Sequence, residues 1–139
     1  MRSQIRLLFA ACVLLLSGCA PQQTSGGAYD ATAKSIVGKW ASQFSTSSGV
    51  MGMSTVTYKA DGTRLQHTEG DGKTLDIEGR YSLKDGELTQ TFVSAKSNGK
   101  NIDPPREKIR KFHVEIRGND MRITIPGEPG DQTFKRIGY

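Results

Sequence analysis

The feature that most constrains the fold is an alternation with period two, which is clearest from Leu75 to Leu83. Successive side chains of a β-strand point to opposite faces of a sheet. One face of this segment would carry Leu75, Ile77, Gly79, Tyr81 and Leu83, and the other Asp76, Glu78, Arg80 and Ser82. The pattern therefore predicts a strand with one buried face and one wet face.

The same rhythm runs from Gly38 to the end of the chain, with turn sequences such as Asp61-Gly62 and Asp85-Gly86 between the apolar runs. The predicted strands are Gly38–Phe44, Met53–Lys59, Thr63–Glu69, Leu75–Leu83, Glu87–Ser94, Lys108–Arg117, Met121–Ile125 and Gln132–Ile137. Closing such a meander removes its two exposed edges. We therefore expect an all-β domain, an eight-stranded antiparallel up-and-down barrel. A short helix within Tyr29–Val37 would precede it.

The beginning of the chain has a different character. Arg2 and Arg6 precede the apolar run Leu7–Leu16. As a helix this run would rise only ~15 Å, whereas a bilayer core is roughly 30 Å thick. The segment therefore reads as a signal peptide rather than a transmembrane helix. Leu16-Ser17-Gly18-Cys19 follows directly behind it.

These four residues resemble the bacterial lipobox, where a diacylglycerol thioether forms on the cysteine and the chain is cut before it. The resemblance implies a further N-linked acyl chain (palmitate), and two or more chains hold a protein firmly to a membrane. Ala20, rather than Asp, after Cys19 implies an outer-membrane lipoprotein with its domain facing the periplasm. The alternative is an ordinary secretory signal that is cut elsewhere.

On this interpretation residues 1–18 are the signal peptide, 19–28 a lipid-anchored flexible linker, and 29–139 the barrel domain. Cys12 would leave with the signal and Cys19 would carry lipid, so no thiol remains for a disulfide or a metal. Removing Arg2 and Arg6 from 19 basic residues leaves 17 against 14 acidic ones, a net charge of +3. That charge is too mild to suggest nucleic acid, and we expect a monomer.

Several segments of the predicted barrel are similar to the lipocalin (calycin) superfamily. Gly38-Lys39-Trp40 resembles its G-x-W signature, and Tyr58–Thr63, Glu78–Leu88 and Thr133–Ile137 resemble hairpins and the closing strand of small bacterial members. The resemblance implies an arginine on the last strand that packs over the tryptophan and closes the base of the barrel. Arg136 matches that position, with Lys135 as the alternative.

The interior of an eight-stranded barrel is either just filled by side chains or leaves room for one small ligand. The candidates for inward positions are Trp40, Val56, Tyr58, Leu65, Leu75, Ile77, Tyr81, Leu83, Leu88, Phe92, Phe112, Val114, Ile116, Met121, Ile123 and Phe134. Since these are large, a filled interior is favoured over an open calyx.

The alternation of strand directions also sorts the connections between two ends. The long segments Ser45–Gly52, Gly70–Gly72, Ala95–Arg106 and Pro126–Asp131 would share one rim, and the turns at Asp61, Asp85 and Asn119 the other. If a small apolar ligand binds, we expect it to enter at the long-loop rim past Met51 and Met53. It would then contact Tyr58, Tyr81 and Phe92.

No catalytic or metal-binding motif accompanies these features. His67 and His113 read as exposed strand residues, and the aspartates fall in turns, where they bond the local backbone. Basic residues gather between Arg106 and Arg122, as a patch for an anionic partner or simply as a solvated face. We expect neither an enzyme nor a cofactor.

The sequence is compatible with two functions. The first is a binding module for a small apolar or amphipathic ligand or an envelope partner. The second is an assembly accessory of the pilotin type, with a packed barrel and no small-molecule ligand. A cavity would favour the first hypothesis.

Overall fold

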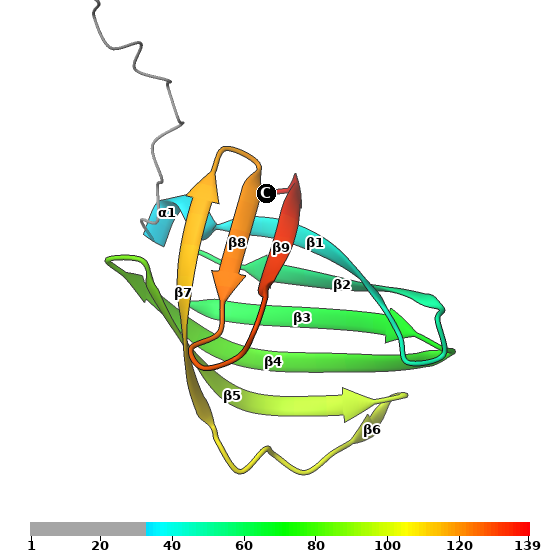
Figure 1. The fold of residues 1–139 in the computed structure, drawn as a ribbon. Coiled ribbons are helices and arrows are strands. Elements are labelled where there is room, and N and C mark those ends of the chain that lie inside the picture. The colour runs from blue at the N-terminus through cyan, green and yellow to red at the C-terminus, as the bar shows by residue number, and fades with distance from the viewer. Residues whose placement is uncertain (1–32) are drawn as a thin grey trace, which may run out of the picture.

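A computed structural model describes residues 33–139 of the chain, which form one barrel with a short helix at its edge (Figure 1). The predicted signal peptide, Cys19, the linker and the first residues of the predicted helix lie outside the described residues. The elements are α1 Ala33–Ile36, β1 Gly38–Ser45, β2 Met51–Tyr58, β3 Thr63–Gly70, β4 Lys73–Lys84, β5 Glu87–Ser97, β6 Lys100–Asn101, β7 Ile109–Arg117, β8 Asp120–Thr124 and β9 Asp131–Gly138.

Eight of these strands close on one another. Their order is β4-β3-β2-β1-β9-β8-β7-β5, and β5 pairs back onto β4 to complete the ring. Every pairing in the ring is antiparallel and joins strands that are neighbours in the chain, apart from the pairing of β5 with β7, across the short β6, and the closure of β1 on β9. This confirms the predicted all-β, lipocalin-like up-and-down barrel with a short helix. The ring of strands closes within the described residues, 33–139.

The short turns follow a common chemical rule. Asp71-Gly72, Asp85-Gly86 and Asn98-Gly99 each place two consecutive residues at positive φ, as a type I′ hairpin requires. The Asn98-Gly99 turn corrects the predicted loop Ala95–Arg106, because β5 continues to Ser97 and folds back as β6. An Asn-Gly pair is a strong hairpin signal, so this feature was available in the sequence.

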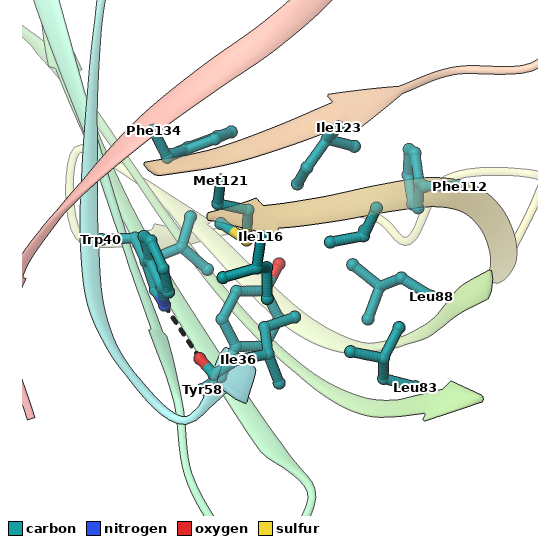
Figure 2. Packing of buried hydrophobic residues seen from close by; sticks show 12 residues of the cluster. Ile36, Trp40, Tyr58, Leu83, Leu88, Phe112, Ile116, Met121, Ile123 and Phe134 are labelled. Carbon is teal, nitrogen blue, oxygen red and sulfur yellow. Dashed lines mark hydrogen bonds between the residues drawn. The ribbon is translucent and has the colours of Figure 1, made fainter. Parts of the chain in front are cut away.

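The hydrophobic core occupies one end of the barrel. Trp40, Tyr58 and Ile36 are almost fully buried there, and α1 supplies Ile36 (Figure 2). The whole buried cluster is Ile36, Trp40, Val56, Tyr58, Leu83, Leu88, Phe112, Val114, Ile116, Met121, Ile123 and Phe134. With the exception of Ile36, each of these was among the residues predicted to point inward.

Strand β3 departs from the prediction. Leu65 is 37% exposed and faces outward, whereas Arg64, Gln66 and Thr68 face the barrel interior. The reason lies in the pairing with β2, where Tyr58 is opposite Arg64 and Val56 is opposite Gln66. Because paired residues of antiparallel strands share a face, burying the two β2 side chains turns the polar residues of β3 inward.

Strand β5 contains a β-bulge. Gly79 of β4 pairs with Phe92 and Glu78 pairs with Ser94, so Val93 is the extra residue between them. The bulge brings the backbones close, since a Cβ on Gly79 would lie 2.6 Å from the carbonyl oxygen of Thr91. It also changes the parity of β5, so that Phe92 and Ala95 both line the interior.

Candidate functional site

The base of the barrel is closed by Arg136. Its guanidinium carbon lies 4.1 Å from the centre of the Trp40 ring and 4.8 Å from that of Tyr139. Its Nη1 and Nη2 donate hydrogen bonds to the carbonyl oxygens of Val37 at 2.6 Å and Ser35 at 2.5 Å. The contact implied by the lipocalin resemblance is thus present at Arg136. The alternative, Lys135, forms an ion pair with Asp120 instead.

Two neighbours explain why this arrangement holds. Trp40 Nε1 donates a hydrogen bond of 2.8 Å to the carbonyl oxygen of Ile36, as the dashed line in Figure 2 marks. Gly38 has φ = +134°, and a Cβ there would lie 2.7 Å from Nη1 of Arg136. Only glycine leaves the guanidinium room to reach α1.

Above this base the barrel interior is hollow. A cavity of about 840 Å³ lies in the half toward the long loops, a volume within the range of ligand pockets. Its apolar wall includes Phe44, Val56, Leu75, Ile77, Phe92, Ala95, Phe112, Ile123, Ile125 and Phe134. The expectation of a filled interior is therefore wrong for this half of the barrel and holds only for the base.

A polar strip runs up one wall of the cavity. Nε2 of Gln66 donates to the hydroxyl oxygens of Ser54 and Thr68, both at 3.1 Å, and those two hydroxyls are 3.0 Å apart. Oε1 of Gln66 accepts from Nη2 of Arg64. These residues come from β2 and β3, and the sequence analysis assigned none of them. The alternation of β2 places Ser54 on the same face as Val56 and Tyr58, whereas the face of Arg64, Gln66 and Thr68 follows only from the register of β3 with β2.

Tyr58 lies at the deep end of the cavity. Its ring meets that of Tyr81 edge to face, with the centroids 4.9 Å apart. Its hydroxyl accepts a 3.0 Å hydrogen bond from Nε2 of Gln90. Burial raises the pKa of this phenol, and the nearby Arg64 guanidinium opposes that increase. Tyr58 is therefore a neutral hydrogen-bonding group at physiological pH.

The predicted ligand contacts divide into two groups. Tyr58 and Phe92 line the cavity. Tyr81 packs beneath Tyr58 and donates a 2.6 Å hydrogen bond to the carbonyl oxygen of Lys59, outside the cavity wall. Met51 and Met53 are 60% and 40% exposed and do not line the cavity. Their proposed role as a lip is wrong, because Val56 and Tyr58 face inward and the alternation of β2 turns Met51 and Met53 outward.

The long loops meet at the mouth, as the sequence predicts. The Ser48 hydroxyl donates to Asp71 at 2.5 Å, and the backbone NH of Thr74 donates to Oδ1 of Asn98 at 2.8 Å. The segment 102–108 passes along the opening between β6 and β7 (Figure 1) and supplies cavity-lining residues. The mouth therefore has a rim built from several connections.

The basic cluster between Arg106 and Arg122 does not form one patch. Arg106, Lys108 and Arg110 line the mouth of the cavity, the last of them paired with Glu128 at 3.4 Å. Lys111 instead pairs with Glu87 at 2.8 Å, and Arg122 pairs with Asp131 at 2.5 Å, next to β9. The basic residues that matter for the cavity are thus the first three.

The two histidines lie on exposed positions of β3 and β7. Nδ1 of His67 is 2.6 Å from Oδ1 of Asp76, and this hydrogen bond raises the pKa of the imidazole, with Glu69 nearby at 3.8 Å. His113 lies 3.7 Å from Glu115. Over residues 33–139, no group of three or more histidine, cysteine, aspartate and glutamate side chains is arranged to hold a metal ion. Nor is any helix in that range long and apolar enough to cross a membrane.

Compared with models of known protein families and with curated protein sequences, the chain matches none. The fold and the closed base stand on the geometry described above. The likeness to lipocalins otherwise rests on the residues quoted from the sequence.

Proposed function

We propose that the protein is a lipid-anchored outer-membrane lipoprotein whose barrel faces the periplasm and binds a small apolar or amphipathic molecule. The anchor is proposed from the lipobox resemblance at Cys19. The binding role is supported by the form of the barrel, which is closed at its base and hollow toward the long loops.

The cavity is the observation that carries the proposal. A barrel that only had to fold would gain dispersion contacts by filling its interior. Here Ser42, Ser54 and Thr68 occupy inward positions on β1, β2 and β3 where larger side chains would fit. The remaining wall is aromatic and aliphatic, as is usual for sites that take small organic ligands.

A pair of variants on β1 tests the binding role. Ser42 lines the cavity, whereas its neighbour Gln43 is exposed and faces outward. Ser42→Phe should place a ring in the cavity and weaken the binding of an apolar fluorescent probe to the purified domain, residues 29–139, at least tenfold. Gln43→Phe adds the same ring outside the barrel and should leave the affinity unchanged.

The outcome decides between ligand binding and the accessory hypothesis. If a panel of apolar probes shows no saturable binding to the wild-type domain, the small-molecule role fails and an assembly accessory becomes the better proposal. If Ser42→Phe and Gln43→Phe weaken the probe equally, the binding site lies outside the barrel.

The anchor requires its own test in the full chain. Cys19→Ser should prevent lipidation and either leave the precursor unprocessed or release the domain from the membrane. Processed Cys19→Ser protein that still sediments with membranes after a high-salt wash would show that lipid on this cysteine is not what holds the protein.

A further inference from the structure

Arg64 is the one charged side chain at the deep end of the cavity that the fold does not pair. Its Nη2 donates to the neutral amide of Gln66, and its buried Nε has no hydrogen-bond partner. Among the ion pairs formed within residues 33–139, none includes Arg64. The guanidinium of Arg64 can therefore donate further hydrogen bonds to a ligand.

The depth of Arg64 follows from the strand register. Arg64 pairs with Tyr58, the last residue of β2. Both residues therefore lie next to the turn that joins β2 to β3 at the closed end of the barrel. The hydroxyl of Tyr58 accepts from Nε2 of Gln90, and the Arg64 guanidinium lies close enough to interact with the same phenol. The Arg64 guanidinium and the Tyr58 hydroxyl therefore meet at the bottom of a mostly apolar cavity.

Such an arrangement is costly without a partner. Arg64 is partly buried, and even partial burial of a charge that lacks a counter-charge disfavours the folded state. Its buried Nε, which has no hydrogen-bond partner, adds to the cost. The same arrangement in a ligand site gives strong selectivity, because only a ligand with the matching acceptor satisfies the buried groups. The guanidinium fork matches the two oxygens of a carboxylate.

From this geometry, and resting on the ligand-binding function proposed above, we propose that the ligand is a monoanionic amphiphile with a carboxylate head, bound head-first. Its carboxylate accepts from Arg64 and from the Tyr58 hydroxyl at the bottom of the cavity. Its apolar tail extends toward the mouth between Phe44, Phe92 and Ile77, which line the upper wall.

The charge at the deep end selects a carboxylate over a doubly charged phosphate. Of the cations that line the cavity, Arg106, Lys108 and Arg110 are at the mouth and only Arg64 is at the base. One guanidinium balances one negative charge. The mouth carries Asp103 and Glu107 beside Arg106 and Lys108, and Arg110 is paired there with Glu128 at 3.4 Å. These charges cancel, so the choice of head group rests on Arg64 at the base.

A matched pair of probes tests the head group. cis-Parinaric acid and its methyl ester share one fluorescent tail, but only the acid carries a charge. We expect the purified domain to bind the acid at least tenfold more tightly than the ester. Arg64→Gln should lower the affinity for the acid about tenfold or more and leave that for the ester within about twofold. Arg80→Gln removes the same charge from the outer face of β4, next to Thr63, and should change neither.

Each outcome has a separate meaning. Equal affinity of the wild-type domain for acid and ester would overturn the carboxylate proposal and leave ligand binding standing. Failure to bind either probe would overturn the proposed function itself. If Arg64→Gln weakened acid and ester equally, Arg64 would be only part of the wall, and the proposal would fail. Since the wild-type comparison needs no substitution, it decides the matter even if the variant does not fold.

Discussion

The two halves of the barrel are made from the same strands but differ in how their interiors are filled. Strand β1 gives Trp40 to the base and Ser42 to the cavity, and β2 gives Tyr58 and Ser54 in the same order. The base is filled by buried side chains, and Arg136 joins it to α1 through two hydrogen bonds. The other half keeps small or polar side chains at inward positions.

One end of each strand therefore contributes mainly to the stability of the barrel, and the other end contributes mainly to the cavity. The base contains most of the fully buried side chains, and therefore supplies most of the burial energy. The hollow half then needs little packing of its own, because hydrogen bonds between strands hold its wall. Substitutions at the base should affect unfolding, and substitutions at the cavity should affect ligands.

The largest contrast is expected between Trp40 and Phe44, which both lie on the inner face of β1. Trp40 is completely buried, so Trp40→Ala should lower the free energy of unfolding by about 3–5 kcal/mol. Phe44 is 36% exposed at the mouth, and Phe44→Ala should cost less than about half of that. Chemical denaturation of both variants measures the two values. Equal losses would contradict the division of the barrel into a packed base and a hollow half.

A smaller effect is expected when only the closing guanidinium is changed. Arg136→Lys keeps the charge, but a single ammonium cannot stack flat on Trp40 and reach the carbonyls of both Ser35 and Val37. The expected loss is about 1–2 kcal/mol. Lys135→Arg, on the outer face beside it, should be neutral. A thermal unfolding curve for Arg136→Lys that overlays the wild type would show that the base is held by apolar packing alone.

The same comparison explains how much could be predicted from the sequence. The strands of the base can be predicted from the sequence, because Val114, Ile116, Met121 and Ile123 alternate with polar residues. This alternation defines which face of each strand is buried. On β3 only Leu65 is apolar, and a single residue does not define a face. Its orientation is set by the register with β2, which is a property of the pair of strands and not of either alone.

The candidate site was predicted only in part for the same reason. Their aromatic rings mark Tyr58 and Phe92 as candidate ligand contacts, whereas nothing in the sequence marks the polar Arg64 and Gln66. The alternation of β2 also places Met51 and Met53 on the outside once Val56 and Tyr58 are inside. The bulge at Val93 has no sequence signal of this kind, since it depends on how closely the backbones of β4 and β5 approach.

Substitution of Arg64 should have the opposite effect on stability from substitution of Trp40 or Arg136. Arg64 is partly buried and has no counter-charge, and replacing such a group by an apolar side chain of similar length is often neutral or stabilising. Arg64→Met should therefore leave the unliganded domain as stable as the wild type or about 1–2 kcal/mol more stable, measured by denaturation without added lipid. A loss above ~2 kcal/mol would mean that the guanidinium supports the fold and is not held in reserve for a ligand.

The smallest effect is expected on the outside of the barrel, at His67. Its hydrogen bond with Asp76, which is the main cause, raises the pKa of the imidazole above its ordinary value near 6.5 in the folded protein. A raised pKa means that the folded state binds the proton more tightly than the unfolded chain. The pair therefore contributes its full stability below pH ~6.5 and loses it as the pH rises through the folded-state pKa. Because both side chains are about half exposed, screening keeps the contribution small.

The melting temperature of the wild type should exceed that of His67→Gln at about pH 5.5, and the two should converge near pH 8.5. Asp76→Asn is the matched control and should remove the same pH dependence. A constant difference across this range would show that the contact stabilises the barrel through packing and not through charge.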